Sequence, residues 1–175
     1  MRDNPSIQTI TNDAVVSPFP VKGHDHGRCI RSALGEAERL CVARGRRLTP
    51  IRRRVLELIW ESHQPVKAYD LPARLRADSG RAAPPTVYRA LDFLLAEHFI
   101  HRLASLNAYV GCGRPAHGHA GQFLICRGCE AVAELDDPAV TELLADRAEA
   151  LGFTLTEPVI ELEGLCPRCR EAGHE

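Results

Sequence analysis

Residues 84–111 read PPTVYRALDFLLAEHFIHRLASLNAYVG, and the fold is inferred outward from this segment. Two prolines suit the first turn of a helix, and the apolar residues that follow recur at helical spacing as far as Phe99. Beyond it the period changes, and we expect strands over 100–104 and 108–111 around a turn. A helix followed by a β-hairpin is typical of a winged helix-turn-helix, with this helix in the recognition position.

Three further helices are expected before this segment. Residues 33–44 carry an apolar stripe at helical spacing. A second helix begins at Thr49-Pro50, with Thr as N-cap and Pro in the first turn, and a short third helix covers about 68–77. Residues 1–27 are rich in turn-forming residues and show no sustained period, so we expect a flexible arm there.

The remainder of the chain alternates strands with cysteine pairs. Residues 111–121 contain four glycines and a proline and predict a hinge. Strands are expected over 122–126, 131–135 and 159–163, with a helix over 138–151. The fold class is therefore α+β, divided as follows: arm 1–27, winged-helix domain 28–111, hinge 112–121 and a zinc-binding C-terminal domain 122–175.

Charge is distributed unevenly between the two halves. Residues 28–103 contain 15 Lys or Arg against 8 Asp or Glu, whereas residues 104–175 contain 5 against 12. A basic half joined to an acidic half favours a polyanion-binding module attached to a domain with another role. No apolar run is long enough for a membrane helix, and the first 20 residues do not resemble a secretory signal. We expect a cytoplasmic protein without a membrane partner.

Two cysteine pairs form the most specific chemical pattern. Cys126-x-x-Cys129 and Cys166-x-x-Cys169 each follow a predicted strand. Four thiolates form the tetrahedral site that zinc prefers. One such pair alone could be a redox motif, but two in one small domain favour a closed, structural zinc site.

A second, looser set of metal ligands spans the two halves. His101 lies in the wing, Cys112 at its end, His119 in the hinge and Glu134 in the strand after the first cysteine pair. Together they are a plausible tetrahedral zinc set. Taken singly, they also suit an exposed histidine, a core cysteine and a solvated glutamate. A single ion bound to all four would fasten the two domains together.

The predicted recognition helix supplies candidate DNA contacts. Thr86, Tyr88 and Arg89 lie in its first turns, off the apolar face, where they could reach bases or phosphates. Alternatively, Tyr88 packs and Arg89 pairs with Asp92. Further candidates for phosphate contacts are Lys67, Tyr69, Arg46, Arg47 and Arg52.

These motifs together resemble the ferric uptake regulator (Fur) family, and more closely its zinc-sensing branch. The resemblance covers roughly residues 33–170. It is carried by RLTP at 47–50, AYDL at 68–71, PPTVYRALDFL at 84–94, FLIC at 123–126 and GLC at 164–166, with both cysteine pairs.

The resemblance implies a homodimeric repressor that binds a palindromic double-stranded DNA operator, with residues 122–175 as the dimerisation domain. It also implies two Zn²⁺ ions per monomer and no other small-molecule substrate. The structural ion falls on Cys126, Cys129, Cys166 and Cys169. The regulatory ion falls on His101, Cys112, His119 and Glu134.

Three alternatives remain at this stage. A sensor of iron or peroxide is disfavoured because HGHAG at 117–121 lacks most of the ligands of the family's iron site. A zinc-ribbon interaction module without a DNA role is disfavoured by the basic half. An enzyme is disfavoured because four protein ligands at each site leave no position for a substrate.

Overall fold

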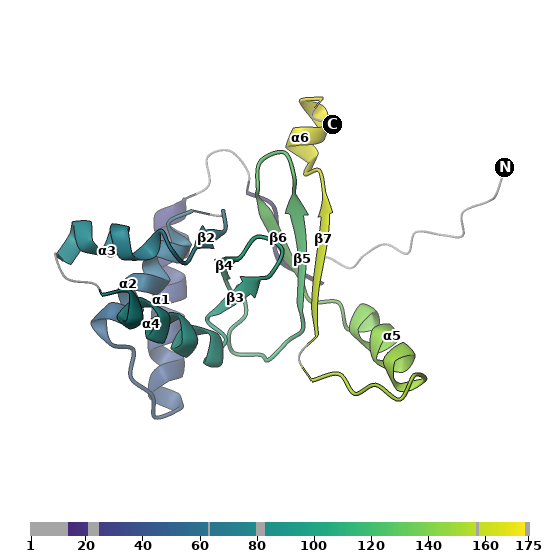
Figure 1. Cartoon of the computed structure of the whole chain (residues 1–175), viewed down its shortest axis with the longest axis horizontal. Coiled ribbons are helices and arrows are strands. Elements are labelled where there is room, and N and C mark those ends of the chain that lie inside the picture. The colour runs from purple at the N-terminus through teal and green to yellow at the C-terminus, as the bar shows by residue number, and fades with distance from the viewer. Residues whose placement is uncertain (1–13, 21–24, 63, 80–82, 157, 174–175) are drawn as a thin grey trace.

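The computed structural model describes residues 14–20, 25–62, 64–79, 83–156 and 158–173. It is α+β, as predicted, with helices and a small sheet on one side and a larger sheet on the other (Figure 1). Among the described residues, no helix combines the length and apolar character needed to cross a membrane.

Four helices and a small sheet make up the N-terminal part. The helices are α1 (His26–Ala43), α2 (Pro50–Trp60), α3 (Leu71–Ser79) and α4 (Pro84–Ala96). Helix α1 begins earlier than the predicted residue 33, because the Asp25 carboxylate accepts a hydrogen bond from the Arg28 amide at 3.1 Å and caps the helix. Apolar faces of all four helices meet in one core.

The predicted hairpin forms the wing. Strands β3 (Ile100–Leu103) and β4 (Ala108–Gly111) pair antiparallel, with Arg102 opposite Tyr109. A third strand, β2 (Val66–Lys67), pairs with β4 and gives the sheet order β2-β4-β3. Strand β2 was not predicted, because two residues are too few to show an alternating pattern.

The C-terminal part is a four-stranded sheet with one helix beside it and a shorter one at its end. Its strands lie in the order β1 (Val15–Ser17), β6 (Val132–Leu135), β5 (Gly121–Cys126) and β7 (Val159–Gly164). Strand β7 runs parallel to β5, and the other pairs are antiparallel. The helices are α5 (Pro138–Glu149) and α6 (Pro167–Glu171), which begins inside the second cysteine pair.

The prediction that residues 1–27 form a flexible arm is wrong for part of that segment. Residues 15–17 form strand β1 on the edge of the C-terminal sheet, and α1 already begins at His26. A three-residue edge strand depends on its partner strand for stability, so the local sequence does not indicate it. Residues 1–13 lie outside the described part of the chain.

The wing packs directly against the C-terminal sheet. Leu103 of β3 shares a buried cluster with Phe123, Ile125 and Val132 of β5 and β6. On β7, the Glu161 carboxylate accepts hydrogen bonds from the Ala104 amide at 2.6 Å, from the Ser105 amide at 3.0 Å and from the Ser105 hydroxyl. This junction positions the wing relative to the sheet.

Candidate functional site

Four potential metal ligands from separate elements converge at the junction between wing and sheet. His101 comes from β3, Cys112 follows β4, His119 precedes β5, and Glu134 comes from β6. One ligand atom from each lies within 4.8 Å of the others, although His101 and Glu134 belong to different sheets. The structure thus brings together the looser of the two sets selected from the sequence.

Distances within this cluster are short, and its ligands are oriented from outside. Glu134 Oε1 lies 2.9 Å from His101 Nε2 and 2.8 Å from His119 Nε2. The Nδ1–H of His119 donates to the carbonyl of His117 at 2.9 Å, which turns Nε2 toward the cluster. The amide of Gly113 donates to the other Glu134 oxygen at 3.0 Å.

The donor set fits a zinc ion. Two imidazole nitrogens, one thiolate and one carboxylate are ligands that zinc accepts in tetrahedral sites. Among the described residues, His101 Nε2 is buried and has no well-oriented hydrogen-bond partner, although Glu134 Oε1 lies 2.9 Å away. A buried polar nitrogen that lacks a hydrogen bond carries a free-energy cost, which coordination to a cation would remove.

In the metal-free protein these groups favour one another's charged forms. The Cys112 thiolate and the Glu134 carboxylate raise the pKa of His119 to about 11. Burial would lower the pKa of His101, but its contacts with Cys112 and Glu134 raise it to about 9. Burial would raise the pKa of Glu134, yet the two histidines lower it to about 2. The same histidines lower the pKa of Cys112 against the effect of burial.

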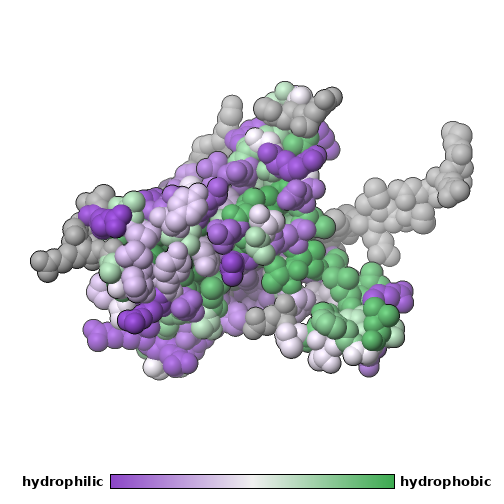
Figure 2. All heavy atoms as spheres, in the orientation of Figure 1, coloured by the Kyte–Doolittle hydropathy of each residue, from purple (hydrophilic) through white to green (hydrophobic). Residues whose placement is uncertain are grey.

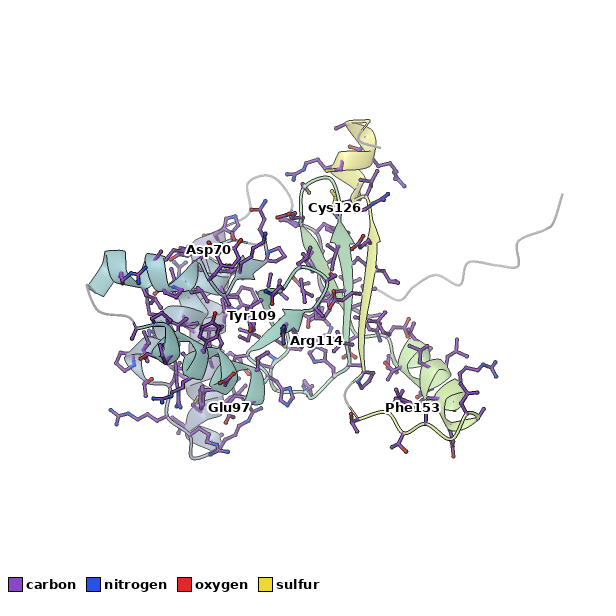
Figure 3. All side chains as sticks on the ribbon, viewed as in Figure 1. Asp70, Glu97, Tyr109, Arg114, Cys126 and Phe153 are labelled. Atoms are coloured by element: carbon purple, nitrogen blue, oxygen red, sulfur yellow. The ribbon has the colours of Figure 1, made fainter. Side chains whose placement is uncertain are left out.

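A second cluster consists of the two cysteine pairs, between the β5–β6 turn and the start of α6. Its four sulfur atoms lie within 4.8 Å of one another, and Cys126 lies near the α6 end of the sheet (Figure 3). Cys129 Sγ and Cys166 Sγ are 3.8 Å apart. This matches the sulfur separation of about 3.8 Å in a tetrahedron with Zn–S bonds of about 2.3 Å. The cluster therefore has the size of a zinc site.

Backbone geometry supports this second cluster. The Cys166 amide donates to Cys126 Sγ at 3.3 Å. A Cβ at Gly128 would lie 3.0 Å from Cys169 Sγ, so a larger residue there would require Cys169 to move by a few tenths of an ångström. Burial raises the pKa of Cys126, but amides of Cys166, Gly128 and Cys129 lower it to about 6. Burial and neighbouring thiols raise the pKa of Cys169 to about 12. A bound cation would favour ionisation of the Cys169 thiol.

The N-terminal end of α4 is exposed, as a recognition helix requires. Thr86 and Arg89 are exposed, and the Tyr88 side chain is 47% exposed. Arg89 forms no salt bridge with Asp92 among the described contacts. Tyr69, just before α3, is 63% exposed, and Lys67 in β2 is half-buried.

Two of the other arginines selected from the sequence make contacts within the chain. The Arg46 guanidinium pairs with Glu97 at 3.1 Å. Arg52 lies over the Phe93 ring, 3.5 Å from its centroid, and donates to the carbonyl of Arg47 at 2.7 Å. Both side chains are therefore less available for phosphates than Arg89.

Sequence reasoning missed the groups that hold the ligands in place. Three groups make these hydrogen bonds: the Gly113 amide binds Glu134, the His117 carbonyl binds His119, and the Glu161 carboxylate binds the wing turn. The first two are backbone groups, which no residue type reveals. Glu161 stands in the alternating stretch VIELEG and had no distinguishing feature in the sequence.

Comparisons with known proteins agree on one group of relatives. Residues 43–163 match the model of the ferric uptake regulator family. The chain is 43% identical over 141 residues to the zinc uptake regulation protein of Escherichia coli K12, covering 79% of this chain and 81% of that protein.

Solved structures agree with these matches. A zinc uptake regulator complexed with zinc and DNA has a TM-score of 0.78 and 41% identity, covering 82% of this chain and 96% of that one. Holo XcZur has a TM-score of 0.75 and 48% identity, covering 80% and 98%. This chain is thus similar to these proteins in both sequence and fold.

Proposed function

The chain belongs to the ferric uptake regulator family, and we propose that it is a zinc-responsive, DNA-binding transcriptional regulator that represses zinc-uptake genes with zinc as co-repressor. The convergence of four zinc-type ligands from both parts of the chain is the observation that carries this proposal. The likeness to a zinc uptake regulator complexed with zinc and DNA supports it.

Each monomer would bind two zinc ions with different tasks. The ion held by Cys126, Cys129, Cys166 and Cys169 would be structural, since four thiolates close its coordination shell. It would join the β5–β6 turn to α6. The ion held by His101, Cys112, His119 and Glu134 would be regulatory.

The regulatory ion would act by fastening the wing to the sheet. His101 belongs to the wing and Glu134 to the C-terminal sheet, while the hinge, 112–121, contributes Cys112 and His119. Arg114 lies near this junction (Figure 3). Without the ion, the winged-helix domain, 28–111, would sample several orientations. A coupling of about 3 kcal/mol between the zinc and DNA sites changes DNA affinity by about 100-fold.

DNA binding would use the exposed end of α4. Thr86, Tyr88 and Arg89 would enter the major groove of a double-stranded operator, and Lys67 and Tyr69 would contact phosphates. A palindromic operator would present two such grooves about one helical turn, or a multiple of it, apart.

A homodimer would form through the C-terminal domain, 122–175. Apolar side chains gather over α5 and the neighbouring β7 (Figure 2). Leu143 and Phe153 are 53% and 63% exposed, and Leu162 of β7 is 56% exposed. An exposed apolar surface of this kind marks an interaction site. A second copy of this chain would cover it.

Zinc is favoured over iron by the chemistry of the regulatory set. Cys112 supplies a soft thiolate, and a 43% identical relative and a 41% identical solved structure are zinc uptake regulators. With four protein donors in each cluster, a catalytic role has no open ligand position. Such a regulator would act in the cytoplasm, where the chromosome lies.

The test is a measurement of DNA affinity across a titration of free zinc. The DNA is a palindromic duplex selected from random sequence by the zinc-loaded protein. We expect affinity to rise about 100-fold as the regulatory sites fill, and to fall steeply with added salt. Tight DNA binding that does not depend on zinc would contradict the proposal. The same rise in affinity with iron(II), at a lower concentration than zinc requires, would also contradict it.

A further inference from the structure

The N-terminal segment 14–20 lies beside the candidate regulatory cluster. Its strand β1 pairs antiparallel with β6, and Ser17 stands opposite Glu134. The carbonyl of Ala14 accepts a hydrogen bond from the Asp136 amide at 2.8 Å. The segment therefore contacts the strand that carries the carboxylate ligand. It also lies outside residues 43–163, which match the family model.

The same strand presses against the loop that follows Cys112. A Cβ at Gly113 would lie 2.7 Å from Val16 Cγ1, so Val16 fits there only because residue 113 is glycine. The Gly113 amide in turn donates to Glu134 Oε2 at 3.0 Å. Val16 thus restrains the loop that follows Cys112. It also holds the Gly113 amide where it can bind Glu134.

Access to the cluster differs between its two sides. The cavity lined by Ser17 and Glu134 has a volume of about 30 Å³, which is room for about one water molecule. The cavity lined by His101 and His119 has a volume of about 600 Å³. The β1 segment thus lies on the carboxylate side, where little space remains, and the larger cavity lies on the histidine side.

The segment extends toward the second cluster as well. Phe19 packs against the buried group formed by Cys126, Ala131, Cys166 and Cys169. This segment of seven residues therefore reaches from one ligand cluster to the other. It is held by strand pairing at one end and by an apolar contact at the other.

We propose that residues 14–20 form a strap that retains the regulatory ion by holding Glu134 and the Gly113 loop in their ligating arrangement. This inference rests on the proposed function, because it requires zinc at that cluster. Outward movement of the carboxylate opens the ligand shell, and the strap opposes this movement. Its removal therefore accelerates release of this ion and leaves the structural ion in place.

The test compares two full-length variants. V15P/V16G/S17P removes two strand amides and the Val16 side chain, which prevents pairing with β6. V15I/S17T keeps strand-favouring residues at both positions and leaves Val16 in place, so it serves as the control. Both are loaded with zinc and mixed with excess EDTA, and the release rate of the Cys112-dependent ion is followed. Hydrogen exchange at the Asp136 amide reports independently on the strap.

We expect the proline variant to release this ion at least about tenfold faster than the wild type, the scale on which groups around metal ligands act. Its Asp136 amide should also exchange faster. The control should match the wild type, and all three proteins should bind two ions at saturation. Equal release rates in the two variants would overturn the strap. A wild-type protein without a Cys112-dependent ion would instead contradict the proposed function.

Discussion

At the scale of single residues, the regulatory cluster depends on groups that fix the direction of each ligand. His119 illustrates this, because its Nδ1–H donates to a carbonyl, and only Nε2 remains to face Cys112 and Glu134. Such an arrangement reduces the conformational freedom that a ligand loses on binding a metal. His119 is thus directed toward the ion site by contacts within the C-terminal part of the chain.

The raised histidine pKa values predict a strong pH dependence of zinc binding. His101 and His119 have pKa values of about 9 and 11 in the metal-free cluster, so both carry protons at pH 7. Zinc needs their neutral forms and must displace about two protons. Zinc affinity should therefore fall as the pH drops from 8 to 6. Calorimetry in buffers of different ionisation enthalpy measures the protons released, and a value near zero would contradict this mechanism.

The stability of the metal-free protein should follow the same groups. The histidine contribution is present below about pH 6.5 and is lost as the pH rises through about 9 and 11. The Glu134 contribution is present above about pH 4.5 and is lost as the pH falls toward 2. Above neutral pH, zinc affinity should thus rise while the stability of the metal-free cluster falls.

Residue types and spacing were enough to select the four cysteines, but for the second ligand set they left alternatives open. The two cysteine pairs indicate a metal site because the cysteines of each pair are only three positions apart. His101 and Glu134 are 33 positions apart, and only packing of the wing on the sheet unites them. The family resemblance selected them where local chemistry left alternatives.

At the scale of secondary-structure elements, the wing turn and β7 form a latch that needs no metal. Glu161 accepts three hydrogen bonds from Ala104 and Ser105, which lower its pKa against the effect of burial. This latch helps to hold the wing in the orientation in which His101 faces Glu134.

Replacing Glu161 should weaken zinc and DNA binding together. In E161Q the side-chain amide replaces the carboxylate, so only one uncharged oxygen remains to accept hydrogen bonds from the wing turn. The turn is then held less firmly. We expect zinc affinity at the regulatory site to drop several-fold, with the structural ion unchanged. Competition with a fluorescent chelator measures it, and E163Q on the same strand is the matched control. Equal affinities in both variants would show that the latch has no such role.

Helix α4 carries the prediction about DNA. R89A should weaken operator binding about tenfold and lower the slope of affinity against salt by about one, because one phosphate or base contact is lost. Zinc content should not change. R127A removes an exposed arginine from the turn between β5 and β6 and should leave operator binding unaltered. Equal losses in both variants would mean that net charge, and not α4, determines binding.

Helices whose first residues carry a start signal such as proline were predictable, and short strands that depend on a partner strand were not. Pro50 and Pro84 mark the beginnings of α2 and α4 as observed. Strands β1 and β2 have three and two residues and exist only because β6 and β4 lie beside them. Their own sequences contain too few positions to show a period.

At the scale of the whole molecule, the chain exposes one surface suited to DNA and another suited to a second subunit. The basic N-terminal part exposes α4, and the acidic C-terminal part exposes an apolar face on α5 and β7. In a homodimer the second copy covers the apolar face, and both α4 helices stay free. In the proposed function, zinc at the regulatory cluster would then set how the two helices are placed relative to each other.

Disrupting the apolar face should separate the two subunits. L143D places a charge on the exposed apolar side of α5, and we expect the protein to become monomeric at micromolar concentration. Operator affinity should fall steeply because two recognition helices no longer act together. Sedimentation measures the mass, with E142A as the control on the same helix. A dimeric L143D protein would place the subunit contact elsewhere.

The decisive measurement is zinc content per monomer together with operator affinity across free zinc, for wild type, C112S and C41A. Cys41 is buried in the α1 core, away from both clusters. Two ions in wild type and C41A, one in C112S, and loss of zinc-dependent DNA binding in C112S alone are the result that we expect. One tightly held ion in all three proteins, with equal DNA binding, would contradict regulation by zinc at this site.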